Sequence, residues 1–471
     1  MAHTLITNGT VVTATETMAA DVLIDGEQVV ALAAHGTQDW TADTTIDASG
    51  KYVFPGGIDV HTHMELPFGG TYASDSFETG TRAAAHGGTT TIIDFAVQVK
   101  GGSAMEGYED WRGKADGNVA IDYGLHMITG DINEQTLKEM DMLVDEGVTS
   151  FKLFMAYPGV FYSDDGEILR AMQKAAENGS VICMHAENGI AIDVYVEQAL
   201  KRGETDPIYH GIVRKSLLEG EAAHRAIVLA ELTGAPLYIV HMSAKEALEE
   251  VKAARDRGLN IFAETCPQYL FFDLDNLGNG FEGAKYVASP PLRDRAAGHQ
   301  EALWTGLRTN DLQVVSTDHC PFCMDEHPEL GVQKRLGEGD FSKIPNGMPG
   351  VEPRFEVMYN GGVNGGRIGL NRFVEIMATT PAKMFGLYPK KGTIAPGADA
   401  DIVIFDPNKK HTITHDTQHM RVDYSAYEGM EVTGKVDTVL SRGRVIVDKG
   451  DYKGKPGDGA YLRRGTSQYL V

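Results

Sequence analysis

Metal-ligand side chains stand at the ends of several short apolar segments of this sequence. His61 and His63 are two residues apart, so in a strand both imidazoles lie on one face and can reach the same metal ion. One histidine at a strand end is usually a hydrogen-bonded core or surface residue, but four separate strand ends with ligand-type residues favour a metal centre. The candidate set is His61, His63, Lys152, His185, His241 and Asp318.

Lys152 is the one ordinary cation in this set, and it lies within the apolar segment FKLFM. In a simple interpretation its stem covers apolar surface while its ammonium reaches water. Beside two divalent cations, burial and positive charge would instead favour the neutral amine, against a reference pKa of about 10.4. A neutral amine can add CO₂ to give a carbamate, which is an anionic ligand able to bridge two metals. The residues alone leave both interpretations open.

The elements that must position these side chains are eight apolar segments, most of them separated by helical patterns. Such alternation predicts a (β/α)₈ TIM barrel, in which the carboxyl ends of all strands share one face. An open doubly wound sheet has the same alternation, but no glycine-rich phosphate loop follows the first strand. The predicted strands are residues 52–60, 89–95, 121–127, 148–155, 180–186, 236–242, 260–265 and 312–318.

Three helices carry recognisable end signals. The segment 133–147 is one, and a second helix over 163–179 has Gly179 placed just beyond its last turn. Ser243 followed by Glu246 predicts a capping box at the start of a third, which Gly258 would end.

The two ends of the chain are rich in β-formers and in glycine-containing turns. Asn8-Gly9 and Asp25-Gly26 are hairpin signals, and segments such as ADIVIFDP near the other end are similarly rich in β-forming residues. We predict that residues 1–56 and 385–471 form one small β-sandwich domain, and that residues 57–384 form the catalytic barrel.

Composition restricts the functional classes. The chain has 471 residues, with 66 acidic and 42 basic side chains and a net charge of −24, which opposes binding to nucleic acid or anionic membrane. No segment approaches the ~18 apolar residues of a membrane span, and no signal peptide is evident. Four cysteines do not make a disulfide framework, and Cys320-x-x-Cys323 is interpreted as incidental thiols. We expect a cytoplasmic enzyme with a small-molecule substrate.

Several segments resemble the cyclic amidohydrolase superfamily, and within it the dihydropyrimidinases and bacterial D-hydantoinases. The resemblance begins with Gly57-x-Asp59-x-His61-x-His63 and covers nearly the whole chain. The other matching segments are Phe151–Phe154, His185–Asn188, Ser289–Arg293, Thr317–Phe322, Ile344–Gly347, Lys391–Ile394 and Ala400–Val403.

The resemblance implies a centre of two divalent metal ions, expected to be Zn²⁺, bridged by carbamylated Lys152 and a hydroxide. It assigns His61, His63 and Asp318 to one ion and His185 and His241 to the other. It also implies that Asp318 moves the proton, that Tyr157 stabilises the oxyanion, and that Ser289 and Asn346 bind the amide edge of the substrate. Without the resemblance, Tyr157, Ser289 and Asn346 would be interpreted as ordinary loop and turn residues. A homotetramer with the C-terminal tail between subunits is implied as well.

The residue Glu65 bears on the substrate. In dihydroorotases an arginine at this position, two residues after the second histidine, grips a carboxylate. Glu65 would repel one, which favours neutral dihydropyrimidines and 5-substituted hydantoins opened to N-carbamoyl amino acids. Phe68, Phe154 and Phe161 are expected at the mouth of the site, and the resemblance implies selectivity for the D enantiomer.

Other functions stay open at this point. An allantoinase or a dihydroorotase-type hydrolase would use the same metal set. A non-catalytic scaffold of the collapsin response mediator type lacks much of that set, whereas every ligand position is filled here. A mononuclear deaminase would leave Lys152 without a clear role.

Overall fold

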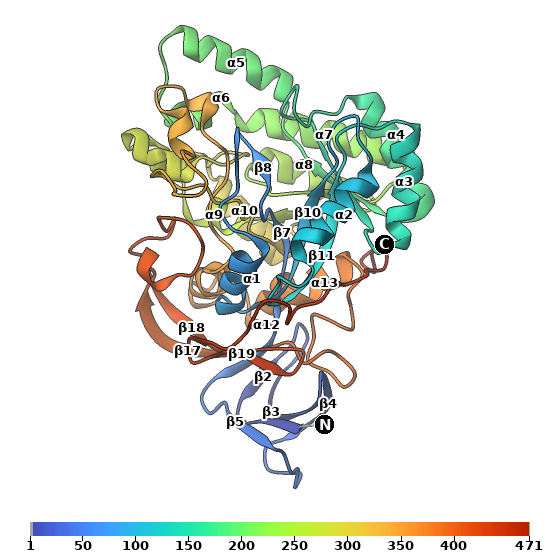
Figure 1. Cartoon of the computed structure of the whole chain (residues 1–471), viewed down its shortest axis with the longest axis vertical. Coiled ribbons are helices and arrows are strands. Elements are labelled where there is room, and N and C mark those ends of the chain that lie inside the picture. The colour runs from blue at the N-terminus through green and yellow to red at the C-terminus, as the bar shows by residue number, and fades with distance from the viewer. Residues whose placement is uncertain (1–2, 471) are drawn as a thin grey trace.

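A computed structural model describes residues 3–470. Eight parallel strands form one sheet in the order β16-β15-β14-β13-β12-β11-β10-β7. The bridge between Thr62 and His319 joins its two edges, so the sheet closes into a barrel surrounded by helices (Figure 1). The strands are β7 (Gly57–Thr62), β10 (Thr89–Val97), β11 (Asp122–Ile128), β12 (Ser150–Phe154), β13 (Val181–His185), β14 (Leu237–Ile239), β15 (Ile261–Thr265) and β16 (Val314–Val315).

All eight predicted segments contribute to this barrel, and the predicted TIM barrel with a β-sandwich domain is confirmed. The first segment, however, is two strands in two sheets: β6 (Tyr52–Pro55) belongs to the small domain and β7 to the barrel. The chain passes between them at Gly56, where a Cβ atom would lie 2.0 Å from the Thr90 hydroxyl. A pattern of apolar residues does not reveal this crossing, because both halves are buried.

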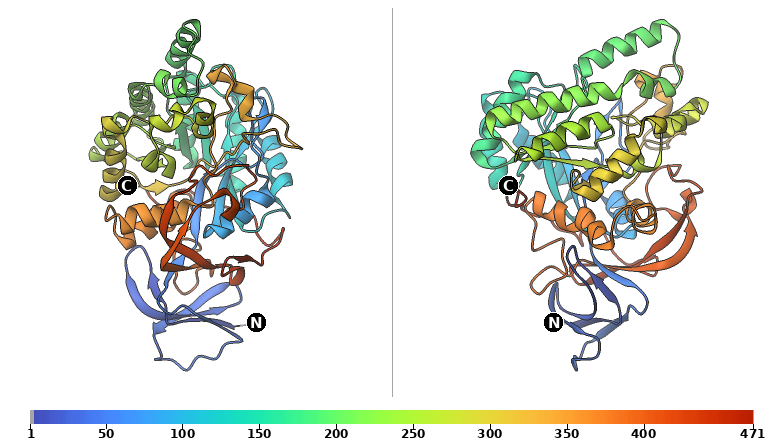
Figure 2. Two further views of the ribbon diagram at one scale, coloured as in Figure 1. Left: turned by 90° about the vertical axis from the view of Figure 1, so that its left-hand side faces the viewer. Right: turned by 180° about the vertical axis from the view of Figure 1, so that it is seen from behind.

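Thirteen α-helices lie between residues 3 and 470, and the longer ones cover the outside of the barrel (Figures 1 and 2). None of them is long and apolar enough to cross a membrane. They are α1 (Phe77–His86), α2 (Ala104–Ala115), α3 (Glu134–Asp145), α4 (Asp165–Asn178), α5 (Gly189–Lys201), α6 (Ile208–Val213), α7 (Ser216–Thr233), α8 (Lys245–Asp256), α9 (Pro267–Phe271), α10 (His299–Thr309), α11 (Arg354–Met358), α12 (Leu370–Val374) and α13 (Thr380–Met384).

The predicted helix ends are confirmed at Asn133, Gly179 and Gly258 and wrong at Ser243; α8 ends at Asp256, and Gly258 has a φ of 80°. Asn133 caps α3 through its side chain, and Gly179 takes the left-handed conformation after α4. The capping box at Ser243 is absent: α8 begins at Lys245 without a side-chain cap. The Ser243 hydroxyl donates instead to the buried carboxylate of Glu219, at 2.6 Å, and this tertiary partner replaces the local one.

Both chain ends contribute to the second sheet, which lies below the barrel in Figure 1. Asp25-Gly26 makes the predicted hairpin between β3 and β4. Asn8-Gly9 does not, because β1 and β2 each pair with β3 rather than with each other. The strands are β1 (His3–Thr7), β2 (Thr10–Val12), β3 (Thr17–Asp25), β4 (Gln28–Ala34), β5 (Thr44–Asp47), β6, β17 (Ile402–Thr412), β18 (Glu431–Ser441), β19 (Arg444–Asp448) and β20 (Asp451–Tyr452).

The segment after β20 returns to the barrel of its own chain. The amide of Leu462 donates to the Tyr123 carbonyl at 2.7 Å, and the Arg464 guanidinium donates to the Ser150 hydroxyl at 2.9 Å. These contacts lie at the amino ends of the barrel strands. The exact domain limits at residues 56 and 385 stay a prediction.

A buried ionic cluster joins the barrel to the small domain. The Lys391 ammonium lies 2.6 Å from carboxylate oxygens of Asp122 and Asp401 and 2.9 Å from Asp399. Burial alone would lower the pKa of Lys391, but the carboxylates of Asp401 and Asp122 raise it above its ordinary value. The three aspartates have a spacing that a metal ion could use, yet the lysine already occupies their centre.

We expect Lys391→Met to lower the free energy of unfolding by about 3–5 kcal/mol, because three buried carboxylates lose the ammonium that they share. Calorimetry should show a clear fall in melting temperature. Lys390→Met is the matched control: its side chain is 61% exposed, so a change within about 0.5 kcal/mol is expected. Equal effects of the two substitutions would contradict the role given to the cluster.

Candidate metal centre

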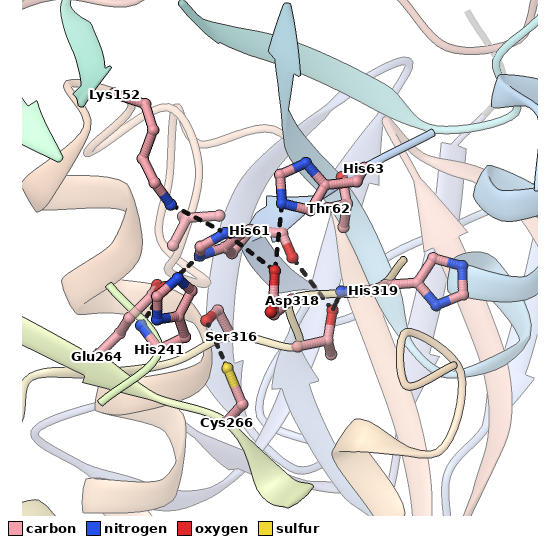
Figure 3. Close-up of polar contacts among 12 residues, drawn as sticks. His61, Thr62, His63, Lys152, His241, Glu264, Cys266, Ser316, Asp318 and His319 are labelled. Carbon is pink, nitrogen blue, oxygen red and sulfur yellow. Dashed lines mark hydrogen bonds and ion pairs between the residues drawn. The ribbon is translucent and has the colours of Figure 1, made fainter. Parts of the chain in front are cut away.

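Three of the predicted ligands meet at the carboxyl end of the barrel. His61 and His63 come from the end of β7, and Asp318 follows β16 (Figure 3). The Asp318 Oδ1 atom lies 3.2 Å from Nε2 of both histidines. One ligand atom from each residue lies within 4.8 Å of the others, so two nitrogens and one oxygen are available to a single ion. Such a donor set suits zinc.

The other predicted ligands lie against this group. His185 ends β13 and His241 follows β14, with 4.5 Å between their ring centroids. The ring of His241 is also 5.2 Å from that of His61, and the Lys152 amine is 3.5 Å from His61 Nε2. The structure therefore brings together all six side chains that the sequence analysis selected.

The state of these imidazoles fits a metal ion. Burial holds the pKa of His61 and His241 well below the ordinary value, so both rings are neutral, as ligation requires. The Nδ1 atom of His241 is buried and has no hydrogen-bond partner among residues 3–470. A polar atom in that state is costly unless it binds something.

Glu264 supports the centre and was missed by the sequence analysis. From the end of β15 its carboxylate contacts Nδ1 of His61, accepts the His241 amide at 3.0 Å and accepts the Tyr238 hydroxyl at 2.9 Å. The contact with Nδ1 directs Nε2 of His61 into the cluster. Burial raises the pKa of this carboxyl to about 8. The sequence did contain a signal for Glu264, because this acidic residue lies at the end of a predicted barrel strand.

Two further carboxylates fix other parts of the centre. Glu187 lies 2.8 Å from Nε2 of His185, which leaves Nδ1 of that ring for other contacts. Asp59 accepts the Thr317 hydroxyl at 2.6 Å and thereby fixes the residue before Asp318. His319 turns away from the cluster toward Asp75, at 2.9 Å (Figure 3).

The predicted substrate residues lie in the same cavity as the ligands. The Asn346 amide nitrogen donates to the Ser289 hydroxyl at 3.0 Å and lies 3.4 Å from the Tyr157 hydroxyl. Burial raises the pKa of Tyr157 to about 12, so its hydroxyl stays a donor. The walls of this cavity include His63, Lys152, Tyr157, His185, His241, Ser289, Asp318 and Asn346.

The rest of the wall is apolar. Phe68, Phe154 and Phe161 all line the cavity, as predicted. The ring of Phe161 stacks on the other two, at centroid distances of 5.0 Å from Phe154 and 6.3 Å from Phe68. Phe68 sits on a short hairpin of β8 (Pro67–Phe68) and β9 (Thr71–Tyr72). Cys320 also lies in the wall, and both it and Cys323 are free thiols.

Glu65 does not line the cavity, so the sequence argument from charge repulsion is not supported. At Glu65 the backbone has a φ of 56°, and the side chain reaches the start of α1, where it accepts the Phe77 amide at 3.4 Å. A carboxylate is favourable there because helix N-termini attract negative charge. Within residues 3–470 the side chains that line this cavity include no arginine, and Arg214 lies in the adjoining hollow that shares Phe68, Tyr157 and Asn346.

Comparisons with known proteins identify relatives that match nearly the whole chain. A model of the amidohydrolase family matches residues 52–446. The chain is 65% identical to the D-hydantoinase of Streptomyces coelicolor, over 100% of this chain and 99% of that one. It is 50% identical to the D-hydantoinase of Geobacillus stearothermophilus, over 98% and 96%. The crystal structure of a dihydropyrimidinase from Brevibacillus agri superposes with a TM-score of 0.96 at 48% identity, covering 99% of each chain.

The barrel, the ligand cluster and the family match together define the class: the chain belongs to the amidohydrolase family. Membership of this family implies a binuclear metal centre. Within that class it belongs to the dihydropyrimidinase/D-hydantoinase family.

We expect Glu264→Gln to weaken zinc binding about 10–100-fold, because His61 loses the carboxylate that orients its ring. Competition with a chelator, followed by metal analysis, measures the change. Tyr238→Phe is the control, since it removes a hydroxyl from the same carboxylate and leaves the His61 contact intact. Zinc affinity of wild-type strength in Glu264→Gln would refute this assignment.

Proposed function

We propose that this protein hydrolyses one ring amide bond of dihydropyrimidines and 5-substituted hydantoins, giving N-carbamoyl amino acids. One observation carries the proposal: six ligand-type side chains and three polar ring-binding residues converge at one cavity that also has an apolar side. The relatives described above, a D-hydantoinase and a dihydropyrimidinase, support the same reaction.

In this proposal His61, His63 and Asp318 hold one divalent ion, His185 and His241 hold a second, and Lys152 serves both. Zinc is the ion we propose. When bound, two such ions polarise the scissile carbonyl and lower the pKa of a nearby water.

The chain's own residues would bind and orient the ring and move the proton. Ser289 and Asn346 hold the amide edge of the ring, largely through backbone groups, and Tyr157 donates a hydrogen bond to the carbonyl oxygen as charge develops on it. Asp318 takes a proton from the attacking water and delivers it to the ring nitrogen as the C–N bond breaks.

Three alternatives are less well supported. A dihydroorotase must bind a carboxylate, and the cavity wall described above has no arginine for it. An allantoinase would have to place a polar ureido substituent against the three phenylalanines. A non-catalytic scaffold would not need all six ligand positions to be filled.

We expect hydantoin, dihydrouracil and 5-phenylhydantoin to be opened, and dihydroorotate and allantoin to be poor substrates. The aromatic rim should accept one orientation of a 5-substituent, and the names of the relatives support the D product. Kinetic assays on this panel, with chiral chromatography of the product, measure both properties. Faster turnover of dihydroorotate, or an L product, would contradict the proposal.

Lys152 has the surroundings that carbamate formation needs. Its side chain is 1% exposed, and its amine lies 4.8 Å and 5.0 Å from the ring centres of Phe95 and Phe154. Burial lowers its pKa to about 8, which increases the share of neutral amine at physiological pH. We propose that this amine adds CO₂ and releases a proton, giving the anionic ligand shared by both ions.

If so, Lys152→Ala should lose metal and activity together, and a short carboxylic acid should restore part of both by filling the vacated position. Metal content and turnover are measured with and without acetate or propionate, and the wild type with the same acid is the control. Intact-protein mass spectrometry should detect one added CO₂ on Lys152. A fully active two-metal enzyme with an unmodified amine would exclude the carbamate.

We further propose a cytoplasmic homotetramer. The four free thiols fit a reducing compartment. Helix α5 stands away from the barrel (Figure 1). Exposed apolar side chains on α5 and α7 support a subunit contact on this side of the molecule. Ile190 is 53%, Leu217 68% and Leu232 73% exposed. Residues 460–469 already pack on their own chain: the Gln468 amide donates to the Lys383 carbonyl at 2.8 Å, and the Asn310 amide nitrogen donates to the Tyr469 hydroxyl at 3.1 Å. A subunit contact through the tail would therefore form on a segment that is already packed.

A further inference from the structure

Two fully buried polar side chains, Gln333 and Lys334, lie at the start of the short 3₁₀ helix η4 (Lys334–Gly337), outside the cavity wall. The Lys334 ammonium donates to three backbone carbonyls: those of Pro345 and Gly347, both at 2.8 Å, and that of Val287, at 3.2 Å. Among residues 3–470 it has no carboxylate within 4.0 Å.

These three carbonyls belong to the two loops that carry the proposed ring-binding residues. Pro345 and Gly347 flank Asn346, and Val287 precedes Ser289 by two residues. The Gly347 amide also donates to the Val287 carbonyl at 2.9 Å, so the loops touch where the ammonium holds them. One cation therefore sets the separation of the two loops on which Asn346 and Ser289 stand 3.0 Å apart.

A buried lysine without a counter-ion is a costly way to fill space. Burial lowers its pKa to about 7, and the three carbonyl dipoles oppose that loss of charge. A methionine would fill a similar volume without this desolvation cost. The contacts indicate that the ammonium maintains the geometry of the two loops and does not merely fill space.

Gln333 points to a different loop. Its amide nitrogen donates to the Tyr72 carbonyl at 2.6 Å and the Thr71 hydroxyl at 3.1 Å, and its oxygen accepts the Cys323 amide at 2.8 Å. Thr71 and Tyr72 form β9, the strand paired with the one that carries Phe68. The neighbouring side chains thus hold two different parts of the cavity wall: Lys334 holds the loops of Ser289 and Asn346, and Gln333 holds the aromatic hairpin.

We propose that Lys334 is a positioning residue for the ring of the substrate and Gln333 one for its 5-substituent. This inference rests on the proposed function, because it assigns each residue to one part of a cyclic ureide. Neither side chain touches the substrate; each acts through the loop that it holds.

The test compares unsubstituted hydantoin with 5-phenylhydantoin in Lys334→Met and Gln333→Leu. Loss of the ammonium frees both ring-binding loops, so Lys334→Met should raise KM about tenfold or more for both substrates by a similar factor, with a smaller change in kcat. Gln333→Leu should leave KM for hydantoin within about twofold and change kcat/KM and enantiomer preference for the phenyl compound. Lys334→Gln, which keeps a donor on a shorter chain, should lie between wild type and Lys334→Met.

Lys391→Met is the matched control, because Lys391 is equally buried but holds carboxylates at the opposite end of the barrel. It should lower the melting temperature without raising KM. An unchanged KM in folded Lys334→Met, or an equal rise in Lys391→Met, would overturn the inference, as would failure of both Lys334 variants to fold. A wild type that opens neither ring would refute the proposed function itself, and the inference with it.

Discussion

Closure of the barrel between β7 and β16 is the constraint on which the site depends. The two strands meet through the Thr62–His319 bridge and through the contacts of Asp59 with Thr317. Asp318 lies between the two residues that make this closure, and His61 and His63 lie on the facing strand. Folding the barrel and placing the ligands are therefore one event, and a shift of register at this seam would separate Asp318 from both histidines.

Much of the architecture and the ligand set could be predicted because both follow from local patterns. A short apolar run that ends in histidine or aspartate is visible in sequence, and the barrel topology then brings the ends together. The roles of Glu264, Glu65 and Ser243 could not be predicted in this way, because each side chain contacts a partner that a local sequence pattern does not indicate. Glu264 reaches His61 across 203 residues, whereas Glu65 turns away from the site toward α1. The change of sheet at Gly56 could not be predicted either, because it lies within one continuous apolar segment.

Three buried lysines illustrate how partners decide what a residue does. Lys391 is surrounded by carboxylates and keeps its charge, Lys334 is held by carbonyl dipoles, and Lys152 has a histidine and two aromatic rings near its amine. Sequence identifies all three only as lysine. Because of these neighbours, Lys391 joins the two domains, Lys334 sets the separation of two loops, and Lys152 is a candidate for carbamate formation.

The small sheet also governs the order in which the protein can be completed during synthesis. Strand β6 pairs with β17, with Pro55 opposite Ile402, and β17 leaves the ribosome on the order of tens of seconds after β6. During that interval β6 has an unpaired edge, and unpaired edges invite pairing with other chains. The nascent protein therefore passes through a stage in which its first strands need shielding, and chaperone supply becomes a determinant of yield.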